Sequence, residues 1–167
     1  GAGGEIYMSA GHATAAGGAV GGRFTVESGD STAGSSGEVL IRSVDAVSGS
    51  GMMVLSTGAA TTGDTGRFTL GTGTTASGRG GDVYISSGVG SGIGGEIRMS
   101  AGASSAGAVG GRFSVESGDS ATGSSGEVLL RSVDAVTGSG MMVLSTGAAT
   151  AGPTGKIQIG SGASTGA

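Results

Sequence analysis

Apolar and polar residues alternate in short stretches that recur along the whole chain. Each stretch follows a glycine and carries an apolar side chain at every second position, as in Phe24 and Val26 or Val83 and Ile85. Strict alternation over about six residues is typical of a β-strand with one buried face. The pattern therefore predicts eleven short strands, which begin after Gly4, Gly22, Gly37, Gly51, Gly66, Gly81, Gly95, Gly111, Gly126, Gly140 and Gly155.

These glycines define a repeat, most of whose spacings are 14 to 16 residues. A longer period lies on top of it, because residues 49–61 recur without change as residues 138–150, 89 positions later. Six units were thus duplicated as a block. We expect residues 1–167 to be one continuous repeat array without a domain boundary, and to be a segment of a longer protein.

The repeat predicts an all-β fold, a parallel β-solenoid (β-helix) of about eleven 15-residue coils with a thin, two-sided cross-section. In each coil a strand with its apolar residues inward would be followed by a corner and a second strand of small residues. Coils of this kind are stable only when they are stacked, because one coil buries too little to stand alone. The alternative is a triangular coil of 44–45 residues that contains three units.

Charge distinguishes the two coils. Triangular coils would stack Arg23 on Arg67, whereas 15-residue coils place Arg23 between Glu5 and Glu38. Like charges on neighbouring strands repel, and opposite charges stabilise by a few tenths of a kcal/mol. We therefore favour the smaller coil, with a charge ladder formed by Glu5, Arg23, Glu38, Arg67, Asp82, Glu96, Arg112, Glu127 and Lys156.

Composition excludes several classes of protein. The chain has 41 Gly but one Pro and no Cys, so collagen and disulfide scaffolds are excluded, and so many glycines argue against helices. A net charge of -4 offers no basic surface for nucleic acid. The longest apolar runs, such as residues 52–55, are too short to insert across a membrane.

The sequence contains no catalytic constellation, so we expect no enzyme and no cofactor. His12 is the sole histidine, and no oriented base or nucleophile accompanies it. Residues 77–84 come close to the calcium-binding β-roll nonapeptide but occur once, whereas that site needs tandem copies. We therefore expect no metal site, although exposed acids could hold calcium loosely. The hydroxyl groups of serine and threonine could carry O-linked glycans.

One set of equivalent positions in the successive coils should face outward and be polar, but several of its residues are apolar. Residues 52–55 are apolar on both faces of their strand, which is typical of a strand covered on both sides. We interpret these side chains as candidate lateral contacts with another copy of the chain. They are Leu40, Met52, Val54, Leu129, Met141 and Val143.

The unit seen in residues 81–88 resembles the Gly/Ser-rich solenoid repeats of very large extracellular proteins from aquatic microbes and microalgae. The resemblance covers the whole chain and implies a fibre, surface or adhesin component. We therefore expect a structural segment of an extracellular fibre or cell-surface filament, which assembles with itself end to end or side by side. The alternative is a module that binds ice or a carbohydrate surface, although the outward threonines form no regular rank.

Overall fold

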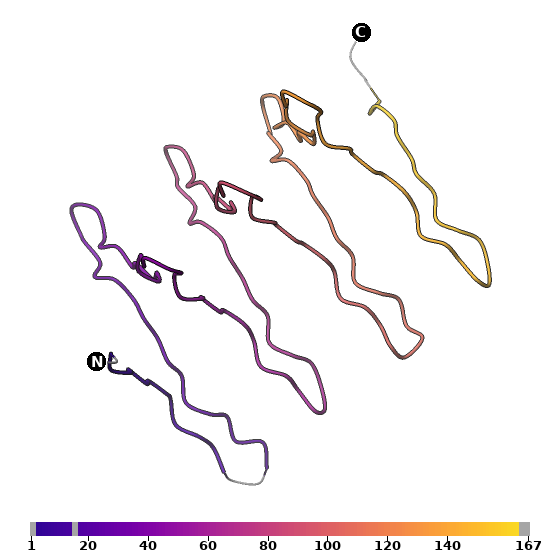
Figure 1. The fold of residues 1–167 in the computed structure, drawn as a ribbon. Helices are drawn as coiled ribbons and strands as arrows, with labels where there is room; N and C mark the ends of the chain where they lie inside the picture. The colour runs from indigo at the N-terminus through magenta and orange to yellow at the C-terminus, as the bar shows by residue number, and fades with distance from the viewer. Residues whose placement is uncertain (1–2, 15–16, 164–167) are drawn as a thin grey trace. The chain divides into compact units, whose positions relative to one another are not determined.

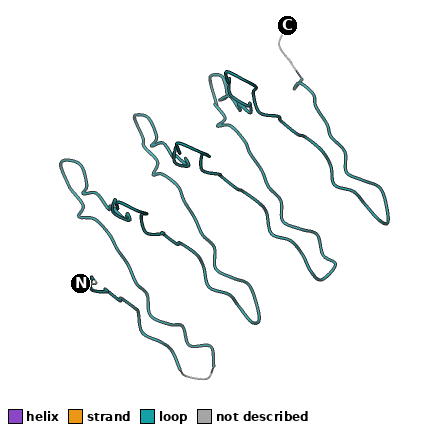
Figure 2. Cartoon of the chain, viewed as in Figure 1, coloured by secondary structure: helices purple, strands orange, loops and turns teal. Residues whose placement is uncertain are grey.

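The structure is a computed structural model that describes residues 3–14 and 17–163. Within these ranges the chain forms neither a helix nor a β-strand, and Figure 2 draws all of it as loops and turns. The predicted all-β parallel solenoid, or β-helix, of 15-residue coils is therefore wrong. The alternative triangular coil of 44–45 residues is wrong for the same reason, because it also requires sheets.

The described chain consists of winding runs joined by reversals of direction (Figure 1). Contacts divide it into two units, Gly1–Tyr84 and Ile85–Ala167. In the first unit the bends lie at residues 17–18, 32–34, 47–48, 61–63 and 76–78. In the second they lie at residues 91–93, 105–108, 121–123, 136–137 and 150–152. Each bend falls between two of the apolar stretches, so the sequence repeat is also a repeat of bends.

Backbone hydrogen bonding explains why the runs do not form sheets. A compact domain makes roughly one hydrogen bond per residue, two-thirds of them between backbone groups. The described residues make five backbone–backbone hydrogen bonds, and each one joins two glycines at the base of a loop. No ladder of bonds connects one described run to another. Alternation of apolar side chains favours extended backbone, but the partner strand that would complete a sheet is missing.

The described residues also form no core. The accessible surface of the chain is 16549 Å². A compact protein of 15.4 kDa exposes about 7,200 Å² and its fully unfolded chain about 22,000 Å². None of the described residues is buried, and Ala13 alone among them is half-buried. The apolar face that the sequence assigns to the interior is therefore exposed to solvent.

The glycine that opens five of the repeats donates a backbone hydrogen bond at the base of a loop. We call this glycine, together with the residue that ends the preceding run, the neck of the loop. Gly22 donates its N–H to the carbonyl of Gly11 at 2.8 Å, and Gly37 donates to Gly29 at 2.9 Å. The duplicated block repeats both bonds, at 2.8 Å from Gly111 to Gly102 and at 2.9 Å from Gly126 to Gly118.

Close approach at the neck accounts for several of these glycines. A Cβ atom at Gly22 would lie 2.9 Å from the amide nitrogen of Gly11, and one at Gly95 would lie 2.9 Å from the Cβ of Ser87. At Gly81 the distance to the Cγ2 of Thr72 would be 3.1 Å. Such distances are shorter than van der Waals contact, so the neck closes best when its opening residue has no side chain.

Other glycines and serines shape the bends themselves. Gly63 and its duplicate Gly152 have φ angles of 90° and 110°, in the left-handed region that favours glycine. In the bend at residues 32–34 the Oγ of Ser31 accepts the N–H of Gly34 at 2.9 Å. Ser120 binds Gly123 in the same way, also at 2.9 Å. Local side-chain bonds of this kind stabilise turns without any contribution from distant parts of the chain.

Replacing Gly22 by alanine is expected to open the neck that it forms with Gly11. The added Cβ would meet backbone at 2.9 Å, so the 2.8 Å hydrogen bond has to lengthen. Losing one such bond corresponds to about a two- to tenfold faster exchange of the amide at position 22. The control is Gly21→Ala, whose Cβ would lie an ordinary 3.5 Å from the carbonyl oxygen of Gly11. Equal exchange in both variants, measured by NMR, would show that the close approach does not matter.

Candidate functional site

The run at residues 112–116 shows directly how side chains alternate along an extended segment. Arg112 donates through Nη2 to the Oγ of Ser114 at 3.2 Å, and Ser114 donates to Oε1 of Glu116 at 2.7 Å. Side chains at every second position of an extended chain lie on the same face. The polar face of this run is thus linked by hydrogen bonds, and Phe113 and Val115 belong to the opposite face. The alternation predicted from the sequence persists without a sheet.

This polar face offers no catalytic arrangement. The hydroxyl of Ser114 is hydrogen-bonded to a carboxylate and a guanidinium, and no histidine lies with it. His12 is itself exposed. Within the described ranges no three His, Cys, Asp or Glu side chains lie close enough together to hold a metal ion.

The charge-ladder residues do not pair with one another in the described chain, where ion pairs form within a single stretch. Arg112 lies 3.6 Å from Glu116, and Arg79 lies 2.7 Å from Asp82. The guanidinium side chains in both pairs are 82% exposed. Exposed pairs of this kind contribute little to stability. Neither pair joins two positions of the predicted ladder.

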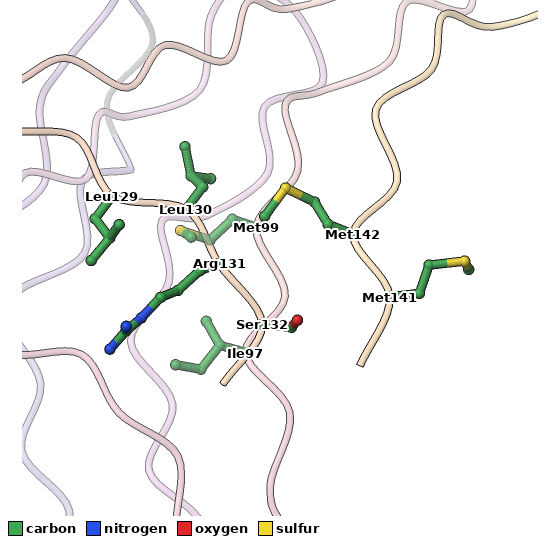
Figure 3. Close-up of a pocket in the computed structure, with 8 residues that line it drawn as sticks. All are labelled: Ile97, Met99, Leu129, Leu130, Arg131, Ser132, Met141 and Met142. Carbon is green, nitrogen blue, oxygen red and sulfur yellow. The ribbon is translucent and has the colours of Figure 1, made fainter. Parts of the chain in front are cut away.

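A shallow, largely apolar hollow of about 710 Å³ lies in the second unit (Figure 3). Three runs supply its lining, at residues 94–104, 124–135 and 138–149. The lining residues are Ile97, Met99, Leu129, Leu130, Arg131, Ser132, Met141 and Met142.

Side chains from different runs line this hollow together. Figure 3 shows Leu130, Met99 and Met142 directed toward the same space, while Met141 extends on the opposite side of its run from Met142. Met142 is 49% exposed and Met141 is 86% exposed, and the duplicate pair Met53 and Met52 shows the same difference at 45% and 87%. Three runs therefore contribute side chains to one hollow, and none of these side chains is buried.

The lining of the hollow includes two kinds of residue: predicted lateral contacts, and residues that the sequence analysis assigned to the interior of a solenoid. Leu129 and Met141 are predicted lateral contacts, and the structure brings them into one lining. Val143, the third predicted contact of this unit, is exposed but is not part of the lining. Sequence reasoning missed Ile97, Met99, Leu130 and Met142, because alternation assigns them to a buried face.

The first unit carries the duplicated counterparts of these contacts. Leu40, Met52 and Val54 are all exposed, and Met52 reaches 87%. We call Leu40, Met52 and Val54 the first contact set, and Leu129, Met141 and Val143 the second contact set. Each unit thus presents one contact set, and the two sets have the same residue types in the same order.

Comparison of the chain with known protein families, with characterised proteins and with solved structures gives no match. Over the ranges that the structure describes, no helix has the length and apolar character needed to cross a membrane. Function therefore has to be argued from the exposed apolar surface and from the repeat.

Proposed function

We propose that this chain is a non-enzymatic structural segment of an extracellular or cell-surface assembly, which it builds by associating with further copies of itself. The observation that carries the proposal is the exposure of the apolar residues. Every large apolar side chain in the described ranges is at least 45% exposed. Contiguous exposed apolar surface on a protein marks a site of interaction, because covering it releases the water around it.

A second copy is the partner that best fits this surface. The segment at residues 49–61 recurs unchanged at residues 138–150, so each chain offers the same surface twice. A contact that suits one segment therefore suits its duplicate on another chain. Unpaired backbone groups along the runs add a second reason, because a neighbouring chain of the same extended character can supply their hydrogen-bond partners.

Charge does not oppose this association. The net charge of -4 is spread along 167 residues, with 8 basic and 12 acidic side chains. Residues 51–57, which contain Met52 and Val54, carry no charge at all. Neighbouring copies can therefore approach along this stretch without burying an unpaired ion, which is the costly alternative.

Two contact sets on one chain make it divalent. A chain with one adhesive surface forms dimers and stops, whereas a chain with two can bind a neighbour through each and grow into a polymer. Divalency is the property that a fibre or filament subunit needs. No observation in the structure favours the alternative of binding ice or carbohydrate, which would require an ordered surface of outward threonines or a defined polar site.

Sedimentation velocity over a wide concentration range tests the proposal. We expect monomers in dilute solution and progressively larger species as the concentration rises, because a divalent subunit grows by mass action. Ammonium sulfate should shift growth to lower concentrations, since it strengthens the burial of apolar surface. A chain that remains monomeric at all concentrations, with or without sulfate, would contradict self-assembly. Thermal hysteresis in the same monomeric sample would favour the ice-binding alternative.

A further inference from the structure

We infer that the paired methionines Met52–Met53 and Met141–Met142 are a modification site, at which oxidation by a peroxide dissolves the assembly. This inference rests on the proposed function, because it concerns the surface through which copies associate. The two pairs lie at equivalent positions of the duplicated block, one in each unit. Each pair contributes one residue to a contact set.

The exposure of the sulfur-bearing residues points to this chemistry. The chain has 6 Met and no Cys, so its only sulfur atoms are thioethers. Met52 and Met141 are 87% and 86% exposed, and their neighbours Met53 and Met142 are 45% and 49% exposed. In compact proteins the core protects most methionines, whereas this chain leaves all six open to a dissolved oxidant.

The reaction itself requires no catalytic group. The thioether sulfur attacks one oxygen of hydrogen peroxide, the O–O bond breaks, an S=O bond forms and water leaves. Sulfur loses two electrons and the peroxide is reduced to water. The product is methionine sulfoxide, in which a flexible apolar side chain has become polar, and which methionine sulfoxide reductases convert back to methionine.

The position of the methionines gives the modification its effect. Met142, Met99 and Leu130 line the hollow of the second unit, and Met141 belongs to the second contact set (Figure 3). A sulfoxide there places a strong hydrogen-bond acceptor on a surface whose association depends on excluding water. Because each contact set contains one methionine of such a pair, oxidation weakens both adhesive surfaces of a chain together.

The test compares wild-type protein with the variant Met52→Leu, Met53→Leu, Met141→Leu and Met142→Leu. Leucine keeps the apolar surface and a similar volume but cannot be oxidised. Both proteins are treated with hydrogen peroxide, and mass spectrometry confirms the product. Six oxygen atoms are expected in wild type and two in the variant, at Met8 and Met99.

In wild type, oxidation is expected to raise the concentration at which assembly begins by about tenfold or more, because the loss of one buried Met side chain alone corresponds to about tenfold. Treatment with methionine sulfoxide reductase should restore assembly. The leucine variant should assemble before and after peroxide. Unchanged assembly of fully oxidised wild type, or equal peroxide sensitivity of the leucine variant, would overturn the inference and leave the proposed function standing. Untreated wild type that never assembles would overturn both.

Discussion

Replacing Leu40, Val54, Leu129 and Val143 by threonine is expected to keep the chain monomeric at concentrations at which the unchanged chain assembles. Threonine has nearly the shape of valine but carries a hydroxyl, so each substitution weakens the apolar contact. Four weakened contacts should raise the assembly concentration by at least about 100-fold, since each lost apolar group corresponds to roughly 1 kcal/mol. Light scattering and sedimentation velocity measure this threshold.

Variants of a single contact set test divalency. With Leu40→Thr and Val54→Thr the second contact set is intact, and with Leu129→Thr and Val143→Thr the first is intact. Either double variant should stop at dimers, because each chain keeps one adhesive surface. Polymers as long as those of wild type from either double variant would contradict divalency.

A matched control separates these contacts from a general effect of added threonines. Ser35, Ser50, Ser124 and Ser139 lie in the loops between apolar stretches, and they form two pairs related by the duplication. Replacing all four by threonine introduces the same residue type at the same multiplicity without removing an apolar side chain. This control should assemble like wild type. Loss of assembly in the control would show that the predicted contact residues have no special role.

The sequence predicts features that depend on neighbouring residues better than features that depend on residues far apart along the chain. Alternation along residues 112–116 is correctly predicted, because the direction of successive side chains depends on the backbone of that run alone. The glycines expected at corners fall into two groups in the structure. Gly22 permits close approach at a neck, and Gly63 supplies a positive φ within a bend.

The predicted sheets are wrong because a sheet depends on partners that are distant along the chain. Each repeat offers two inward apolar residues, and their burial falls short of the entropy lost when a glycine-rich unit is ordered. Ladder hydrogen bonds between runs would have to supply the difference, and the described runs make none. The choice between a 15-residue and a 44–45-residue coil rested on charges between stacked strands, and such strands are absent from the described residues.

The lining of the hollow was predicted only in part, because the prediction assumed that half of the apolar residues would be buried in a core. Leu129 and Met141 stand out in the sequence because they are apolar where an outward position should be polar. Met99 and Leu130 could not be identified in this way, because an inward apolar residue is ordinary if a core exists. Without a core both faces of a run are exposed, and residues of both faces line the hollow.

The dilute chain is expected to show almost no protection of its backbone amides from hydrogen exchange. Protection arises when amides are hydrogen-bonded and opening them requires unfolding a cooperative unit. The described runs lack both a ladder of hydrogen bonds and a buried core. We expect slowed exchange only at neck amides such as Gly22 and Gly37 and at serine-bonded amides such as Gly34. In the assembled protein the runs should become protected, because neighbouring copies cover them.

Amide hydrogen exchange at two protein concentrations is therefore the most direct test of the central claim, that the described residues form no core of their own and that, as we propose, further copies cover them. The claim predicts near-intrinsic exchange along residues 51–57 and 140–146 in dilute monomer, and strong protection of the same segments above the assembly threshold. Protection of these segments in the dilute monomer would contradict it, because it would show that a single chain buries its own apolar residues.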